Sequence, residues 1–267
     1  MAVSLFRLCV VAVALISVSA SASAQRSVLA EVGFNSDFVW RGVTSTNRLV
    51  IQPDVSFSVP VRGNAFTLGV WGNVEPRRYD GERDISSLNG LPGPLVTQSE
   101  IYANFTRTIG RVDALLGTEA YFYPHVADLD EFNTLEILAT LTVDAPVSPT
   151  VNVSYDVGRI RGAYIETGLT RAITSEQRGE LTFGVLAGFS AGQATDPRGR
   201  DMAYFDRNGL THVDASASAT VARGRVAISP ELHVIYARDP LAMVTEPDRA
   251  RRSKLWFGTT LSWASDR

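Results

Sequence analysis

Cysteine is nearly absent from the chain, since Cys9 is the only one among 267 residues. It lies early in an apolar run, residues 8–20, and not at the end of that run, where a lipoprotein anchor would need it. The rest of the chain can therefore form no disulfide and holds no thiolate nucleophile and no cysteine-ligated metal site.

The apolar run is too short to span a membrane as a helix, and its surroundings are typical of a secretory signal peptide. The basic residue Arg7 precedes it, and the small residues Ala22-Ser23-Ala24, which resemble a cleavage site, follow it. We expect cleavage before Gln25, which divides the chain into a signal peptide, residues 1–24, and one domain, residues 25–267.

Long apolar runs are lacking in the rest of the chain. Beyond residue 24 no run reaches the roughly 18 apolar residues that a spanning helix needs. Lipid offers backbone N–H and C=O groups no hydrogen-bond partners, so a chain of this kind enters a membrane only as a closed β-barrel.

An excess of positive charge is also missing. The chain has 25 Lys and Arg against 28 Asp and Glu, and without Arg7 the balance is 24 − 28, a net charge of −4. This balance excludes a nucleic-acid binder. The chain has three histidines and no cluster at metal-ligand spacing, so we expect no cofactor and no metal site. Asp128, Asp130 and Glu131 could bind calcium weakly, but their spacing is unspecific.

What the chain does contain is apolar and polar residues in alternation. In "TLEILATLTVD", residues 134–144, and in "ELTFGVLAGFSAG", residues 180–192, apolar side chains fall on one parity and polar or small ones mostly on the other. Period two predicts β-strands that are apolar on one face. The alternation predicts about twelve strands, near the length that a tilted spanning strand needs. We place these strands at 29–41, 50–60, 65–75, 98–108, 112–124, 134–144, 150–158, 162–172, 179–192, 210–222, 225–238 and 254–263.

The connections between these strands have a rhythm of their own. Links such as "VRGN" and "IGR" are short, whereas the links at 76–97, 193–209 and 239–253 are long and polar; the short link at 159–161 is the exception. Short turns on one rim and long loops on the other indicate an all-β, transmembrane, antiparallel up-and-down barrel with periplasmic turns and extracellular loops. A soluble periplasmic β-sandwich is the alternative, but its inner face would carry large interlocking residues, where this chain has Gly, Ser, Thr and carboxylates.

The last predicted strand ends in an aromatic residue, Trp263, four positions before Arg267. This resembles the signal that barrel-assembly machinery recognises, and we expect that machinery to be a partner during biogenesis. The expected location is the cell outer membrane of a Gram-negative bacterium, in contact with outer-membrane lipid and lipopolysaccharide. Arginine clusters in "EPRRYDGERD", "DPRGRD" and "EPDRARRSK" suit lipopolysaccharide phosphates, although they would also suit a solvated loop.

The stretch "GFNSDFVWRGVTST", residues 33–46, places Asp37 and Arg41 on either side of an apolar trio. If the first strand runs through to residue 41, Phe38 and Trp40 share the lipid-facing parity, at the level where aromatic girdles lie. Asp37 and Arg41 then face the lumen.

This stretch also carries a family resemblance. Serine, two alternate aromatics, Arg-Gly and two alternate hydroxyl residues follow the signal peptide, in a pattern that resembles the TorF-type porin family of bacterial outer-membrane barrels, also filed as a domain of unknown function. The matching residues are Ser36, Phe38, Trp40, Arg41, Gly42, Thr44 and Thr46. The resemblance implies an outer-membrane barrel, and it says little about a substrate.

Carboxylates dominate the inward parity and outnumber the bases there, so an open pore would weakly prefer cations. The predicted pore-lining residues are Asp37, Arg41, Asp54, Glu100, Asp113, Glu119, Glu136, Asp156, Glu166, Asp214 and Glu231. We therefore predict a porin that lets small solutes diffuse passively. Because a barrel of about twelve strands is only moderately wider than one filled by side chains, a plugged lumen stays open as an alternative.

A plugged barrel would be a structural or adhesive protein that works through its surface loops. A third alternative is an outer-membrane hydrolase, for which His212 and Ser216, four residues apart on one face, would be the candidate pair. No nucleophile-elbow pattern accompanies that pair, and we predict that the protein is not an enzyme.

Overall fold

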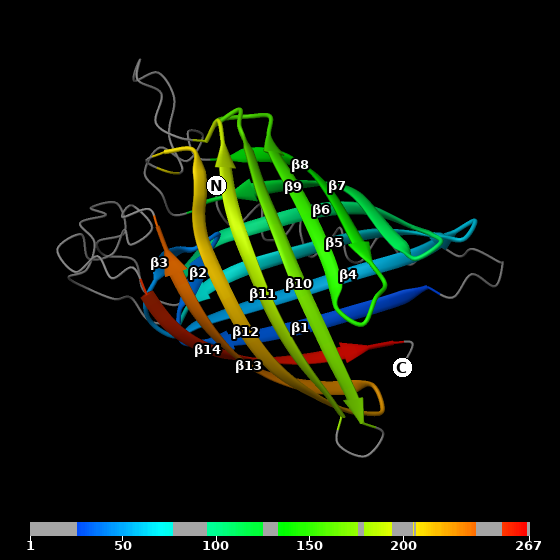
Figure 1. The fold of residues 1–267 in the computed structure, drawn as a ribbon. Helices are drawn as coiled ribbons and strands as arrows, with labels where there is room; N and C mark the ends of the chain where they lie inside the picture. Colours follow the sequence, from blue (N-terminus) through cyan, green and yellow to red (C-terminus); the bar gives the residue numbers. More distant parts are fainter. Residues whose placement is uncertain are drawn as a thin grey trace.

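The computed structural model describes residues 26–76, 95–124, 133–175, 179–193, 205, 207–238 and 253–265. In this part of the chain twelve strands form one closed antiparallel barrel, and β2 and β3 form a separate two-stranded sheet (Figure 1). The strands of the barrel are β1 (Ser27–Asn35), β4 (Val50–Val61), β5 (Asn64–Glu75), β6 (Leu95–Ile109), β7 (Val112–Phe122), β8 (Thr134–Val143), β9 (Ser148–Asp156), β10 (Ala163–Ser175), β11 (Gly179–Ala191), β12 (Gly209–Arg223), β13 (Val226–Ala237) and β14 (Ser253–Ala264). No described helix is long and apolar enough to cross a membrane.

The barrel closes through its first strand. β1 pairs with β14 on one side, where Val32 lies opposite Leu261, and with β4 on the other, where Glu31 lies opposite Asp54. The other strands pair with their neighbours in an up-and-down order. Every strand of the barrel therefore has a hydrogen-bonded partner on both edges, as lipid requires. The twelve-stranded barrel predicted from the alternation is confirmed.

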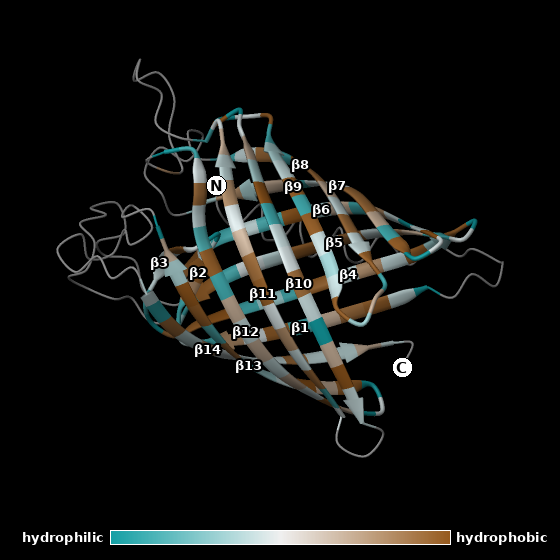
Figure 2. Cartoon of the chain, viewed as in Figure 1, coloured by the Kyte–Doolittle hydropathy of each residue, from teal (hydrophilic) through white to brown (hydrophobic). Residues whose placement is uncertain are grey.

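The alternation in the sequence corresponds to the two faces of the barrel wall, and Figure 2 shows apolar and polar residues alternating along the strands. Large apolar side chains are exposed on the outer surface; on β11 and β14 the exposed fractions are 49% for Phe183 and 43% for Leu261. Side chains of opposite parity, such as Glu100 on β6 and Glu136 on β8, are buried instead. An outer apolar surface around a polar interior is the arrangement of a membrane barrel.

Tight turns join the strands at one rim. Residues 62–63, 110–111 and 224–225 each link two strands with two residues. In the first of these turns both Arg62 and Gly63 have positive φ, 50° and 80°, as a type I′ turn requires. At the opposite rim the links are longer, and 157–162 is the shortest of them.

The predicted first strand, 29–41, is wrong at its end. β1 stops at Asn35, and residues 38–46 form β2 (Phe38–Trp40) and β3 (Val43–Thr46), which pair as a hairpin. Figure 1 shows the β2–β3 hairpin at the end of the barrel away from the C-terminus. The link from β1 to β4 is thus a loop on the long-loop rim with its own secondary structure.

A charge introduced by mutation on the outer face of the barrel tests which face of the wall contacts lipid. Val185 lies midway along β11 with an exposed apolar side chain. Val185→Arg should lower the free energy of unfolding in lipid vesicles by about 2–4 kcal/mol, because the guanidinium would enter hydrocarbon. Denaturant titration of the refolded barrel measures this, with Val185→Leu as the matched apolar control. Equal stabilities of the Arg and Leu variants would contradict a lipid-facing position.

Candidate functional site: a hairpin folded into the lumen

The β2–β3 hairpin is built on an Arg-Gly turn. Arg41 and Gly42 both have positive φ, 51° and 78°, which is the requirement of a two-residue hairpin turn. Trp40 lies opposite Val43, and Val39 opposite Thr44. The pattern that carries the family resemblance is therefore two short alternating strands on either side of a tight turn.

The aromatic residues of the hairpin do not face lipid, which corrects the prediction for Phe38 and Trp40. Phe38 is only 6% exposed and packs on Trp71 of β5, with ring centroids 5.8 Å apart. Trp40 meets Tyr121 of β7 edge-on at 5.9 Å. Because the chain leaves the barrel wall at Asn35, the parity of β1 does not continue, and both rings pack against inward-facing side chains.

Arg41 fixes the tip of the hairpin to the far wall. Its Nη1 and Nη2 donate to Oε1 and Oε2 of Glu136 on β8, at 2.8 and 2.5 Å. The guanidinium also lies over the rings of Trp40 and Tyr164, at 4.1 and 4.4 Å. The side chains of Arg41 and Glu136 are 7% and 2% exposed, so the loss of one partner would leave the other buried without its counter-charge.

Gly42 allows the tip to approach β12. A Cβ atom at this position would lie 2.4 Å from Cγ of His212, so no larger residue fits without displacing the hairpin. Tyr164 of β10 stacks on the ring of His212.

In the order of strands around the barrel, β8 and β10 lie opposite β1. The β2–β3 hairpin therefore crosses the lumen from one wall to the other.

Polar contacts on both of its strands hold the base of the hairpin. Asp37 forms an ion pair with Lys254 of β14, and Ser36 Oγ donates to Asp37 at 2.6 Å. On the other side Thr46 Oγ1 donates to Glu75 Oε1 at 2.6 Å. Asp37 and Arg41, which flank the apolar trio, thus anchor opposite ends of one strand of the hairpin.

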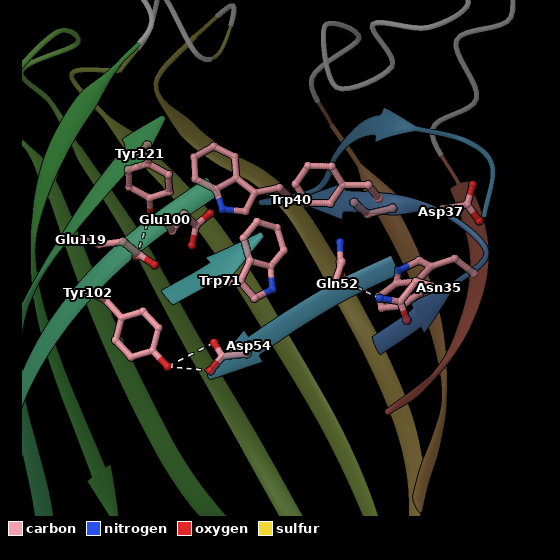
Figure 3. Close-up of a pocket in the computed structure, with 13 residues that line it drawn as sticks. Asn35, Asp37, Trp40, Gln52, Asp54, Trp71, Glu100, Tyr102, Glu119 and Tyr121 are labelled. Atoms are coloured by element: carbon pink, nitrogen blue, oxygen red, sulfur yellow. Dashed lines mark hydrogen bonds between the residues drawn. The ribbon is translucent and has the colours of Figure 1, made fainter. Parts of the chain in front are cut away.

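A cavity of about 330 Å³ lies between the hairpin and the wall. From the hairpin side it is lined by Asp37, Phe38, Val39 and Trp40, and from the wall by Asn35, Gln52, Asp54, Trp71, Glu100, Tyr102, Glu119, Tyr121 and Trp256. Figure 3 shows these side chains converging from both sides, with the Tyr102 hydroxyl directed at the Asp54 carboxylate. Tyr102 donates to both oxygens of Asp54, at 2.9 and 3.1 Å, and Tyr121 donates to Glu119 at 2.8 Å.

The structure brings four of the predicted pore-lining carboxylates to this cavity: Asp37, Asp54, Glu100 and Glu119. The others have separate surroundings. Asp156 accepts from Thr134, Glu166 accepts from Tyr164, and Asp113 accepts from Thr108 at the opposite end of the barrel. Asp214 lies 2.8 Å from His233 Nδ1, with Glu231 3.6 Å from the other ring nitrogen.

The aromatic side chains that face inward are absent from the predicted pore-lining residues. Tyr102 is two residues from Glu100, and Tyr121 is two from Glu119, so parity alone assigns both to the lumen. Trp71 lies opposite both Asp54 and Glu100. The rule that aromatics gather at the lipid interface drew attention away from this signal.

The candidate hydrolase pair is not assembled in the described residues. His212 Nδ1 is 3.1 Å from Thr211 Oγ1, and no hydrogen bond joins His212 to Ser216. A Cβ on Gly184 would lie 2.7 Å from Ser216 Oγ, which places that hydroxyl beside β11. The calcium candidates Asp128, Asp130 and Glu131 lie outside the described residues.

The fold defines the class of protein as an outer-membrane-type β-barrel. The structure is similar to those of LpxR from Salmonella typhimurium, at 10% identity over 89% of this chain and 99% of that one with a TM-score of 0.50, and of an outer-membrane channel from Pseudomonas putida F1, at 8% identity over 93% and 100% with a TM-score of 0.50. At these identities the likeness shows the fold alone. A comparison with curated protein sequences gives no significant match.

Residues 19–178 match the model of Gcw_chp, a bacterial protein of unknown function, so the chain belongs to this family. The matched region includes the hairpin and the strands from β1 to β10. The TorF-type designation stays a prediction.

The rate at which a thiol on the hairpin reacts with a maleimide measures how firmly the wall holds the hairpin in place. Thr44 on β3 is 4% exposed, and the predicted mature chain has no cysteine, so a maleimide would report on Thr44→Cys alone. Adding Glu136→Ala should speed labelling at least about tenfold, because a buried pair broken on one side costs about 3–5 kcal/mol. Gly42→Ala should act in the same direction.

Glu180→Ala is the matched control, because this carboxylate lies at the start of β11 and accepts from Thr174 and Thr182. Its labelling rate should equal that of Thr44→Cys alone. If Glu136→Ala leaves the rate unchanged, the hairpin is not held by Arg41.

Proposed function

We propose that this protein lies in the bacterial outer membrane and lets small solutes diffuse passively through its lumen, with the β2–β3 hairpin as the constriction. One observation carries the proposal: the hairpin crosses a polar, carboxylate-lined lumen but leaves a cavity of about 330 Å³ beside it. A loop that narrows the interior in this way limits the size of a solute.

The charges around the constriction support a preference for cations. Two bases near the hairpin, Arg41 and Lys254, are already in ion pairs, with Glu136 and Asp37. Asp54 and Glu119 have no ion pair with a base in the described part of the chain. Uncompensated carboxylates in a narrow, low-dielectric passage raise the local concentration of cations.

The proposed partners follow from the outer surface. Exposed apolar side chains on every side would contact outer-membrane lipid, and the arginine-rich segments, which lie outside the described residues, are proposed contacts for lipopolysaccharide phosphates. Trp263 near the end of β14 is on the outer face, where barrel-assembly machinery could reach it. The resemblance to TorF-type porins agrees with the proposal.

A second candidate function is a closed barrel that works through its surface loops. The observation that favours it is the same hairpin, which reaches β8, β10 and β12 from β1 and so occupies the lumen from wall to wall. In this case the ion pair of Arg41 and Glu136 would serve stability and not gating. Liposome swelling with small sugars separates the two candidates, since only a channel gives swelling.

Conductance in planar bilayers tests the channel directly. The wild-type protein should show discrete openings and a reversal potential of the sign for cation preference in a KCl gradient. Replacing residues 38–46 with a short Gly-Ser linker should raise the conductance several-fold, because the constriction is removed. Asp54→Asn with Glu119→Gln should weaken the cation preference, while Arg62→Gln, a change in a turn outside the lumen, should not.

Two results would contradict the proposal. A barrel that conducts only after the hairpin is replaced is closed in its native form, which favours the second candidate. A clear anion preference of the wild type would contradict the role given to the carboxylates.

A further inference from the structure

The polar side chains around the cavity beside the hairpin bond mainly to one another. Asn35 Nδ2 donates to Gln52 Oε1 at 2.7 Å, and Gln52 Nε2 donates to Asn73 Oδ1 at 3.0 Å. The hydroxyls of Tyr102 and Tyr121 donate to Asp54 and Glu119. Each of these amides therefore uses one of its two N–H groups within the wall, and both phenol hydroxyls are engaged, whereas Trp256 Nε1 has no partner in the described structure.

The acceptors are in surplus. Asp54 and Glu119 have carboxylate lone pairs beyond those used by one tyrosine each, since an ionised carboxylate offers about four acceptor sites. Asn35 Oδ1 does not add to this surplus, because it lies against Gly258 of β14, where a Cβ atom would be 2.0 Å from it. The two carboxylates can therefore accept further hydrogen bonds from a ligand that carries donors.

The charge and the aromatic rings of the lining determine which kind of ligand the cavity favours. None of the lining residues is basic, and Asp37 is the one lining carboxylate paired with a base among the described residues, Lys254. Three indoles line the cavity, those of Trp40, Trp71 and Trp256. Aromatic faces attract cations, and tryptophan does so most strongly. Carboxylates without a paired base beside three indoles therefore favour a cation over a neutral sugar.

We propose that the cavity binds a small organic cation with N–H donors, of the alkyl diamine class. An ammonium group would donate to Asp54 and Glu119 while its alkyl chain lies against the indoles. The volume is at the lower end of the range of about 300–1,000 Å³ for ligand sites, which suits a short diamine. The proposal deepens the proposed cation preference, but binding can be measured whether or not the barrel conducts.

Isothermal titration calorimetry on the detergent-solubilised mature protein, with intrinsic tryptophan fluorescence as a second readout, tests this. The probes are 1,4-diaminobutane, its uncharged isostere 1,4-butanediol, and tetramethylammonium, which has the charge without N–H donors. The diamine should bind at one site and at least about tenfold more tightly than either comparison probe, because charge-assisted hydrogen bonds are the strong ones.

Asp54→Asn and Glu119→Gln should each weaken diamine binding about tenfold, since each replaces a charged acceptor with a neutral one of the same shape. The new amides keep an acceptor for Tyr102 and Tyr121, and heat-modifiable gel mobility checks that each variant is folded. The matched control is Glu180→Gln, a carboxylate outside the cavity, which should leave the affinity unchanged.

The proposal is overturned if the diol or tetramethylammonium binds as well as the diamine, if neither cavity variant changes the affinity, or if Glu180→Gln lowers it equally. The last result would mean diffuse attraction by the negative lumen. Binding as expected in a barrel that does not conduct would support this site and contradict the proposed channel.

Discussion

The structure depends on one constraint: in hydrocarbon, every backbone N–H and C=O group needs a hydrogen-bond partner within the protein. β1 meets this constraint for the whole sheet by pairing with both β14 and β4. Closure then gives each strand two distinct environments, lipid outside and a lumen inside. The alternation of side chains along β11, with Phe183 outward, follows from those two environments.

Closure also creates the space that the hairpin occupies. A barrel of twelve strands is wider than one that side chains fill, so an interior with buried Glu136 needs either water or a protein segment. The loop between β1 and β4 provides the segment. Its Arg-Gly turn sharply reverses the chain, and its arginine compensates the charge of Glu136. The same contacts that fill one side of the lumen leave the acidic, aromatic cavity on the other.

The sequence predicted the wall well because period two is a local property. The strands, their faces and the two kinds of connection all follow from it, and the inward position of Glu100, Glu119 and Glu136 follows from parity. The hairpin was missed because the aromatics of residues 38–40 fit two environments, the lipid interface and a packed lumen. The Arg-Gly dipeptide at 41–42 is the local signal for a turn, and it resembles the turn at 62–63. The pairing of Arg41 with Glu136, 95 positions apart, has no local signature at all.

A nitroxide scan by electron paramagnetic resonance would test whether residues 36–46 lie inside the barrel or on its lipid-facing wall. Single labels at 36–46 and at 181–187, in lipid vesicles, would be compared for collision with oxygen, which concentrates in the hydrocarbon. The structure predicts strong oxygen contact at alternate positions of 181–187, including Phe183 and Val185, and weak contact throughout 36–46. Oxygen maxima at Phe38 and Trp40 would contradict it, because those side chains would then face the acyl chains.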